Sequence, residues 1–124
     1  MATANDVKLF LLKTADAVNR SEQAQSIVKE ACRHYPGKIF QFNVEGTEFH
    51  LVFFADGHVE LRDGEYPSAD VHYISDPDTF LGVLKGEKQL RDVTADWSFI
   101  IEGAMHETTY LAKAITTAYK IEKI

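Results

Sequence analysis

The first part of the chain has the apolar spacing of two amphipathic helices. Asn5 or Asp6 can cap the first helix, and Ser21 can begin a second one that should end at Pro36 and Gly37. Apolar side chains recur at intervals of three and four residues in both segments. They are Val7, Phe10, Leu11, Thr14 and Val18 in the first, and Ala24, Ile27, Val28, Ala31, Cys32 and Tyr35 in the second. The pattern predicts helices ahead of the first strand.

From residue 38 the pattern changes to the alternation that is typical of a β-sheet. In KIFQFNVEG, residues 38–46, three apolar residues alternate with polar ones and predict a half-buried strand. FHLVFFADGHVEL, residues 49–61, predicts a hairpin in which Asp56 and Gly57 form a two-residue type I′ turn. ADVHYIS, residues 69–75, and WSFIIEG, residues 97–103, predict a fourth and a fifth strand.

The hairpin turn decides which side chains share a face of the sheet. A two-residue turn places Phe54 opposite Val59 and Val52 opposite Leu61, and we expect these side chains to face the helices. The other face of the hairpin would then be apolar as well and would need a cover. The first helix could supply it, but we favour a homodimer through that face, which consists of Phe49, Leu51 and Phe53.

Helices are also predicted around the last strand. Asp76 can cap a short helix that has Pro77 in its first turn and ends at Gly86, whereas residues 87–95 show no regular pattern. A closing helix should begin at Met105. Its apolar stripe consists of Leu111, Ala114, Ile115 and Ala118.

Composition and charge narrow the function classes. The 124 residues carry a formal net charge of −6, which disfavours a nucleic-acid partner because phosphate binding needs clustered Lys and Arg. The apolar runs are too short to span a membrane, and the glycines form no phosphate-binding loop that would indicate a cofactor. Cys32 is the single cysteine, and the start MATANDVK lacks a basic segment, so we expect a protein of the reducing cytoplasm.

The order of elements from Lys38 onward resembles the sterol carrier protein type-two (SCP-2-like) lipid-binding domain family. FQFNVEG is similar to that family's first strand, FHLVFFADGHVEL to its second and third, and ADVHYISDPDTFLGVLKGE to its strand, helix and glycine. FIIEGAMHETTYLAKAI is similar to its last strand and closing helix. The likeness covers about residues 38–115. Residues 1–20 would be an extra helical segment of a single domain spanning residues 1–124.

The resemblance implies a fold and a ligand. The fold is α+β, with a five-stranded, mainly antiparallel sheet and helices packed on one face, enclosing an apolar tunnel. The function is non-enzymatic binding or transfer of a fatty acyl chain, phospholipid or sterol-like ligand. The family often has Gly-Lys before its last strand, where this chain has Asp96-Trp97-Ser98, so the pocket mouth should differ. Candidate lining residues are Phe40, Phe42, Val52, Phe54, Leu61, Phe80, Leu84, Phe99, Ile101, Met105, Leu111 and Ile115.

Two other function classes stay open at this point. A cone-shaped α+β enzyme could use Asp70, His72 or Asp96 for acid/base chemistry, and burial beside Trp97 could raise the pKa of the Asp96 carboxyl. The helical pattern at the end of the chain disfavours it, because such cones end in strands. The second open class is a ligand-free accessory domain that presents apolar surface to an enzyme. The histidines do not have metal-site spacing, so no metal is expected.

Overall fold

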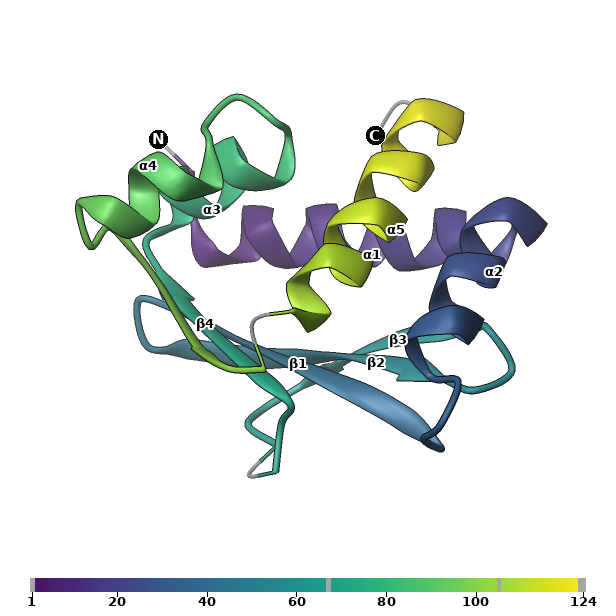
Figure 1. The fold of residues 1–124 in the computed structure, drawn as a ribbon. Helices are drawn as coiled ribbons and strands as arrows, with labels where there is room; N and C mark the ends of the chain where they lie inside the picture. Colours follow the sequence, from purple (N-terminus) through teal and green to yellow (C-terminus); the bar gives the residue numbers. More distant parts are fainter. Residues whose placement is uncertain (1, 67, 105, 123–124) are drawn as a thin grey trace.

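The computed structural model describes residues 2–66, 68–104 and 106–122. In chain order, its helices and strands are α1 (Ala4–Asn19), α2 (Glu22–Ala31), β1 (Gly37–Val44), β2 (Thr47–Phe54), β3 (Val59–Asp63), β4 (Val71–Ser75), α3 (Pro77–Leu84), α4 (Leu90–Ala95), β5 (Phe99–Gly103) and α5 (Glu107–Glu122). Figure 1 shows the helices above one face of the sheet.

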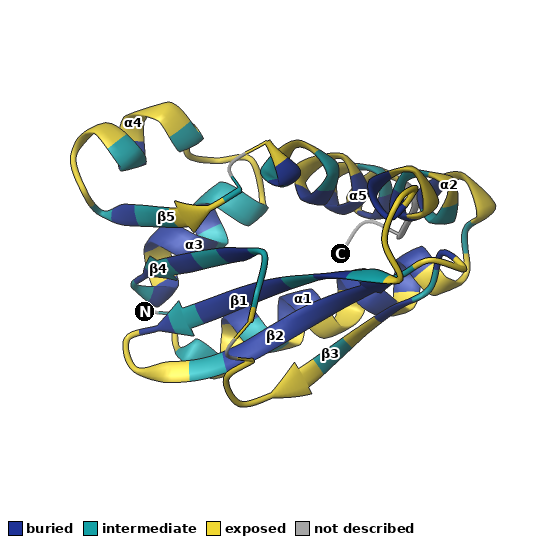
Figure 2. Ribbon diagram, turned by 60° about the horizontal axis from the view of Figure 1, so that its bottom comes forward, coloured by how far each residue is buried: buried dark blue, intermediate teal, exposed yellow. Residues whose placement is uncertain are grey.

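The sheet is mixed but mostly antiparallel. Its strand order is β3-β2-β1-β4-β5, and β1 pairs parallel with β4, while the other neighbours are antiparallel. The predicted α+β class with a five-stranded, mainly antiparallel sheet is therefore confirmed. The third strand is an edge strand, also as expected, and Figure 2 shows most of it as exposed or intermediate, whereas β2 is mostly buried.

The helix ends agree with the predicted capping residues in part. Thr3, rather than Asn5 or Asp6, caps α1, and Asp6 completes a capping box with it. Ser21 caps α2, and Asp76 with Pro77 begins α3, as predicted. Helix α2 ends at Ala31, earlier than expected, and α3 ends before Gly86. Helix α4 was not predicted, because its six residues are too few to show a period.

The hairpin turn is one residue longer than predicted. The backbone N–H of Phe54 donates to the carbonyl of His58 over 3.0 Å, which leaves three residues, 55–57, in the loop. Gly57 has a φ of 100°. Among the described residues other than glycine, Glu45 and Trp97 have a positive φ and Asp56 does not, so Asp56 does not adopt the type I′ conformation. A three-residue loop with glycine in this position is the next commonest hairpin connection.

One extra loop residue exchanges the two faces of the hairpin. Phe53 lies opposite Val59 and Leu51 opposite Leu61, so the predicted pairs of Phe54 and Val52 are wrong. The side chains that face the helices are Phe49, Leu51 and Phe53, which are 0%, 1% and 1% exposed. The proposed homodimer through this face loses its basis, because the chain itself already covers the face.

The helices cover that face with a continuous core. The Phe53 ring lies 4.9 Å from the Phe40 ring, and Phe49 lies 5.8 Å from Phe42. Helix α1 adds Val7, Phe10 and Leu11 to the same cluster. Its last residue, Asn19, pins the helix to β3, since its side-chain amide bonds the N–H and the carbonyl of Val59 over 2.7 and 2.8 Å.

The opposite face of the sheet carries the polar half of the strand pattern. A connecting segment crosses part of it: the N–H of Tyr66 donates to Gln41 Oε1 over 2.8 Å, and His50 Nδ1 lies 2.9 Å from the carbonyl oxygen of Gly64. Phe54 also lies on this face, where its ring stacks on His58 at 4.1 Å. Phe54 therefore belongs to the hairpin surface and not to the layer between sheet and helices.

Candidate functional site

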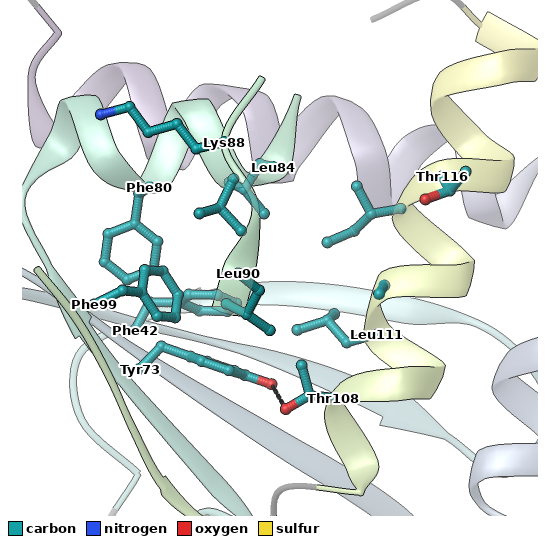
Figure 3. Close-up of a pocket in the computed structure, with 13 residues that line it drawn as sticks. Phe42, Tyr73, Phe80, Leu84, Lys88, Leu90, Phe99, Thr108, Leu111 and Thr116 are labelled. Carbon is teal, nitrogen blue, oxygen red and sulfur yellow. Dashed lines mark hydrogen bonds between the residues drawn. The ribbon is translucent and has the colours of Figure 1, made fainter. Parts of the chain in front are cut away.

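An apolar cavity of about 180 Å³ lies between the sheet, α3, α4 and α5. Figure 3 shows the strand side chains below it, those of α3 beside it, and Leu111 and Thr116 projecting from α5. The cavity is lined by Phe42, Tyr73, Phe80, Val83, Leu84, Lys88, Leu90, Phe99, Thr108, Leu111, Ala112, Ile115 and Thr116.

One wall of this cavity is aromatic. Phe42 on β1 and Tyr73 on β4 are register partners, and their rings lie 5.3 Å apart. Phe80 reaches the same cluster from α3, with its ring 5.9 Å from Phe42 and 5.0 Å from Phe99. Alternation along β1 and β4 puts Phe42 and Tyr73 on the helix side of the sheet. The Asp76 cap begins α3, and Phe80 on this helix reaches the same aromatic cluster. This wall offers rigid apolar surface.

The cavity also has a small polar element. The Tyr73 hydroxyl and Thr108 Oγ1 are 2.9 Å apart and form a hydrogen bond. Burial raises the pKa of Tyr73, so its phenol stays protonated across the physiological range. The pair can therefore donate or accept one hydrogen bond, but it cannot act as a base at neutral pH. Apolar contact dominates what the cavity can do chemically.

A wider groove of about 670 Å³ adjoins the cavity. It runs between α2, β5 and α5, and its apolar contributors include Ile27 and Ile101. Four residues, Leu90, Thr108, Ala112 and Thr116, line both spaces. Because these residues line both spaces, the groove lies directly beside the cavity.

The predicted lining residues divide into several groups. Those that line the cavity are Phe42, Phe80, Leu84, Phe99, Leu111 and Ile115, and Ile101 lines the groove. Phe40 is buried in the core, and Leu61 packs against the core from β3. Val52 and Phe54 were expected on the helix side, and this is wrong, because the hairpin register places them on the opposite face. Met105 lies outside the described residues.

Several residues that line the cavity were not predicted from the sequence. Tyr73 shares its strand face with Val71, so alternation along β4 could have identified it. Leu90 belongs to the unforeseen α4. Ala112 and Thr116 lie on the more polar side of α5, and no sequence pattern indicates that a groove runs beside them.

The acid/base candidates have structural partners. Asp70 Oδ2 accepts a hydrogen bond from the N–H of Ile39 over 2.7 Å, and Asp96 Oδ1 accepts one from the N–H of Ser98 over 2.9 Å. Hydrogen bonds from Ser98 lower the pKa of Asp96, so the expected increase is wrong. Neither Asp70, His72 nor Asp96 lines the cavity or the groove.

Among residues 2–66, 68–104 and 106–122, no group of three or more His, Cys, Asp or Glu residues could hold a metal ion. No helix formed by the same residues is long and apolar enough to cross a membrane.

The chain is similar to known proteins in its structure. No protein-family model matches the sequence, and no curated protein matches it. The structure of a UbiJ-SCP2 ubiquinone synthesis protein is similar, with a TM-score of 0.67 and 19% identity over 94% of each chain. Sterol carrier protein 2 from Yarrowia lipolytica, in its apo form, has a TM-score of 0.62 and 14% identity over 89% of this chain and 88% of that one. The chain has the sterol carrier protein 2 fold.

The same fold also occurs inside a larger enzyme. The sec-alkylsulfatase Pisa1 from Pseudomonas sp. matches 72% of this chain but only 14% of its own length, with a TM-score of 0.57 and 16% identity. At these identities the likeness shows the fold, and the ligand has to be argued from the cavity.

Proposed function

We propose that this domain binds or transfers lipid without catalysing a reaction, and that the aromatic cavity holds part of the ligand. The observation that carries the proposal is the cavity itself, together with its open continuation along α5. Fatty acyl chains, phospholipids and sterol-like molecules are the expected ligand classes. The sterol carrier protein 2 fold of the chain supports the same conclusion.

The size of the cavity limits which part of a ligand it takes. An engineered apolar cavity of about 150 Å³ binds benzene. A space of about 180 Å³ therefore suits a ring or the end of a chain, and the rest of a long lipid would lie in the adjoining groove. Burying each CH₂ group contributes about 0.8 kcal/mol, so several methylene groups suffice for useful affinity.

The polar pair gives a reason to include ring-bearing lipids. A carbonyl or hydroxyl on a ring in the cavity could bond the hydroxyls of Tyr73 and Thr108, which both line it. One structural neighbour is described as a ubiquinone synthesis protein, so a ubiquinone belongs among the ligands to be tested.

The experiment is extraction of the purified protein, followed by mass spectrometry and by thermal shift with added lipids. Bound lipid should be found, and stripped protein should regain its melting temperature with oleic acid, phosphatidylcholine, cholesterol or a ubiquinone. Clean extracts and no shift with any of them would contradict lipid binding and favour a ligand-free accessory domain.

A variant tests the position of the ligand. Ala112→Phe adds a large side chain on the exposed shared wall of the cavity and groove, so it should lower lipid content at least several-fold while the fold is kept. Lys120→Phe on the same helix is the matched control, because Lys120 lines neither space. Equal lipid content in both variants would place the ligand elsewhere.

A further inference from the structure

Trp97 is displayed on the surface in an unfavourable backbone conformation. It is the single tryptophan of the chain and is 78% exposed. It follows Asp96, the C-cap of α4, and has a φ of 67°. Glycine is the usual residue at this position after a helix, because a side chain there is strained. The indole gains no burial here and its backbone conformation is strained, which favours a role for this side chain outside the fold.

The loop around Trp97 is ordered by hydrogen bonds. The N–H of Trp97 donates to the carbonyl of Thr94 over 3.3 Å, and Asp96 Oδ1 accepts from the N–H of Ser98 over 2.9 Å. The backbone is therefore held on both sides of the residue, and the indole is presented from a defined position. Figure 1 shows α4 and the loop after it at the periphery of the molecule.

Trp97 connects two elements that form the proposed lipid site. Helix α4 contributes Leu90, which lines both the cavity and the groove, and β5 begins with Phe99, which belongs to the aromatic wall. We propose that Trp97 anchors the domain to the surface of a phospholipid bilayer, where lipid enters or leaves the site. This inference rests on the proposed lipid-binding function. Tryptophan suits the role because its ring is apolar and its N–H can stay hydrated at the headgroup level.

The charges around the loop decide which bilayer is expected. Residues 85–98 contain three basic and three acidic side chains, namely Lys85, Lys88 and Arg91 against Glu87, Asp92 and Asp96. The whole chain carries a net charge of −6. No electrostatic attraction to anionic lipid follows from this balance, so the indole should supply most of the binding. We therefore expect docking on zwitterionic phosphatidylcholine, and weaker docking when anionic phosphatidylglycerol is added.

The single tryptophan makes docking directly measurable. Phosphatidylcholine vesicles should shift the emission of Trp97 to shorter wavelength and protect it from acrylamide, and the protein should float with the vesicles on a density gradient. An emission maximum that stays unchanged, with no flotation, would overturn the proposal.

A glycine substitution separates docking from folding and from lipid binding. Trp97→Gly relieves the strained φ, so its melting temperature should be equal or higher, while flotation should fall at least five-fold. Leu12→Ser, which removes another exposed apolar side chain from α1, should float like the wild type. Undiminished flotation of Trp97→Gly would assign docking to another surface and overturn the proposal.

The lipid content of Trp97→Gly should equal that of the wild type, because Trp97 lines neither the cavity nor the groove. Extracted lipid measured without vesicles thus tests the proposed function separately. Wild-type protein that contains lipid but does not float with the vesicles would contradict the bilayer anchor alone, whereas wild-type protein without lipid would contradict the proposed lipid site.

Discussion

Lys38 and Glu107 form an ion pair inside the protein, with Lys38 Nζ 3.3 Å from Glu107 Oε2 and each side chain 6% exposed. Lys38 belongs to β1 and Glu107 is the first residue of α5, so the pair joins the sheet to the helix that lines the cavity and the groove. The Tyr35 ring lies 3.8 Å from Lys38 Nζ and covers it. The pair therefore fixes the start of α5 above the sheet.

Glu107→Gln should lower the free energy of unfolding substantially. The substitution leaves the Lys38 ammonium buried without its partner, and breaking a buried pair in this way costs about 3–5 kcal/mol. Urea unfolding followed by circular dichroism measures the change. Because α5 lines both the cavity and the groove of the proposed lipid site, the lipid content of the variant should fall with its stability.

Two controls show whether the pair acts as a unit. His106→Ala removes an exposed neighbour whose Nε2 lies 3.0 Å from Glu107 Oε1, and it should change stability by less than about 1 kcal/mol. The double variant Lys38→Met with Glu107→Leu should recover most of the loss, because no unpaired charge stays buried. A double variant as unstable as Glu107→Gln would show that the charges do not interact.

The sequence predicted the order of helices and strands better than it predicted which side chains of the β2–β3 hairpin face the helices. Alternation identified the strands, and capping residues such as Ser21 and Asp76 located two helix starts correctly. The pair Asp56-Gly57 fits both a two-residue and a three-residue turn, and the choice between them reverses every side chain in β2. Since that strand is apolar on both sides, its own pattern could not correct the choice.

Alanine substitutions at Phe53 and Phe54 test the observed register. Phe53→Ala should destabilise the protein by about 3–5 kcal/mol, because it opens a cavity beside Phe40 in the core. Phe54→Ala should cost about 1 kcal/mol, since it removes a half-buried ring that stacks on His58. Denaturant titration of both variants decides the order. The reverse order would favour the two-residue turn.

The residues of the candidate site were predictable where they belong to the apolar faces of strands and helices. Phe42, Phe80 and Leu111 line the cavity because apolar strand and helix faces converge there. Phe40 shows the same alternation two residues earlier in β1, but it lines neither the cavity nor the groove. Periodicity shows which side chains turn inward, whereas a void depends on how well the layers fit together. The position of the cavity therefore depends on tertiary packing, which periodicity does not show.

The hairpin end contains a pH-sensitive cluster. Hydrogen bonding to the Asp56 carboxylate, 2.5 Å from His58 Nδ1, raises the pKa of His58, and bonding to His58 lowers the pKa of Asp56 and Glu60. The charged histidine contributes stability below its unfolded pKa of about 6.5, and this is lost as pH rises through the raised folded pKa. The carboxylates contribute above about pH 4.5, and their contribution is lost as pH falls through their lowered pKa values.

NMR titration of the His58 ring should therefore give a pKa above that of the unfolded chain. Asp56→Asn removes the carboxylate and should lower the His58 pKa towards its ordinary value, and Arg62→Gln is a control that leaves Asp56 in place. An unchanged His58 pKa in Asp56→Asn would contradict the hydrogen bond.

The hairpin turn packs against α2 at Gly57. A Cβ atom at Gly57 would lie 3.0 Å from Lys29 Cε and 3.1 Å from the backbone oxygen of Gln25, and the φ of 100° is unfavourable for any side chain. Gly64 has a φ of 91° but open space around it, so a substitution at Gly64 measures the effect of backbone strain alone.

Gly64→Ala should thus cost about 1–2 kcal/mol. Gly57→Ala should cost a further 1–3 kcal/mol or so, because overpacking against α2 is added to the same strain. Urea unfolding of the two variants gives the difference. Equal losses would mean that α2 does not press on the turn, and the packing that holds α2 would then have to come from its buried side chains Ala24, Val28 and Ala31.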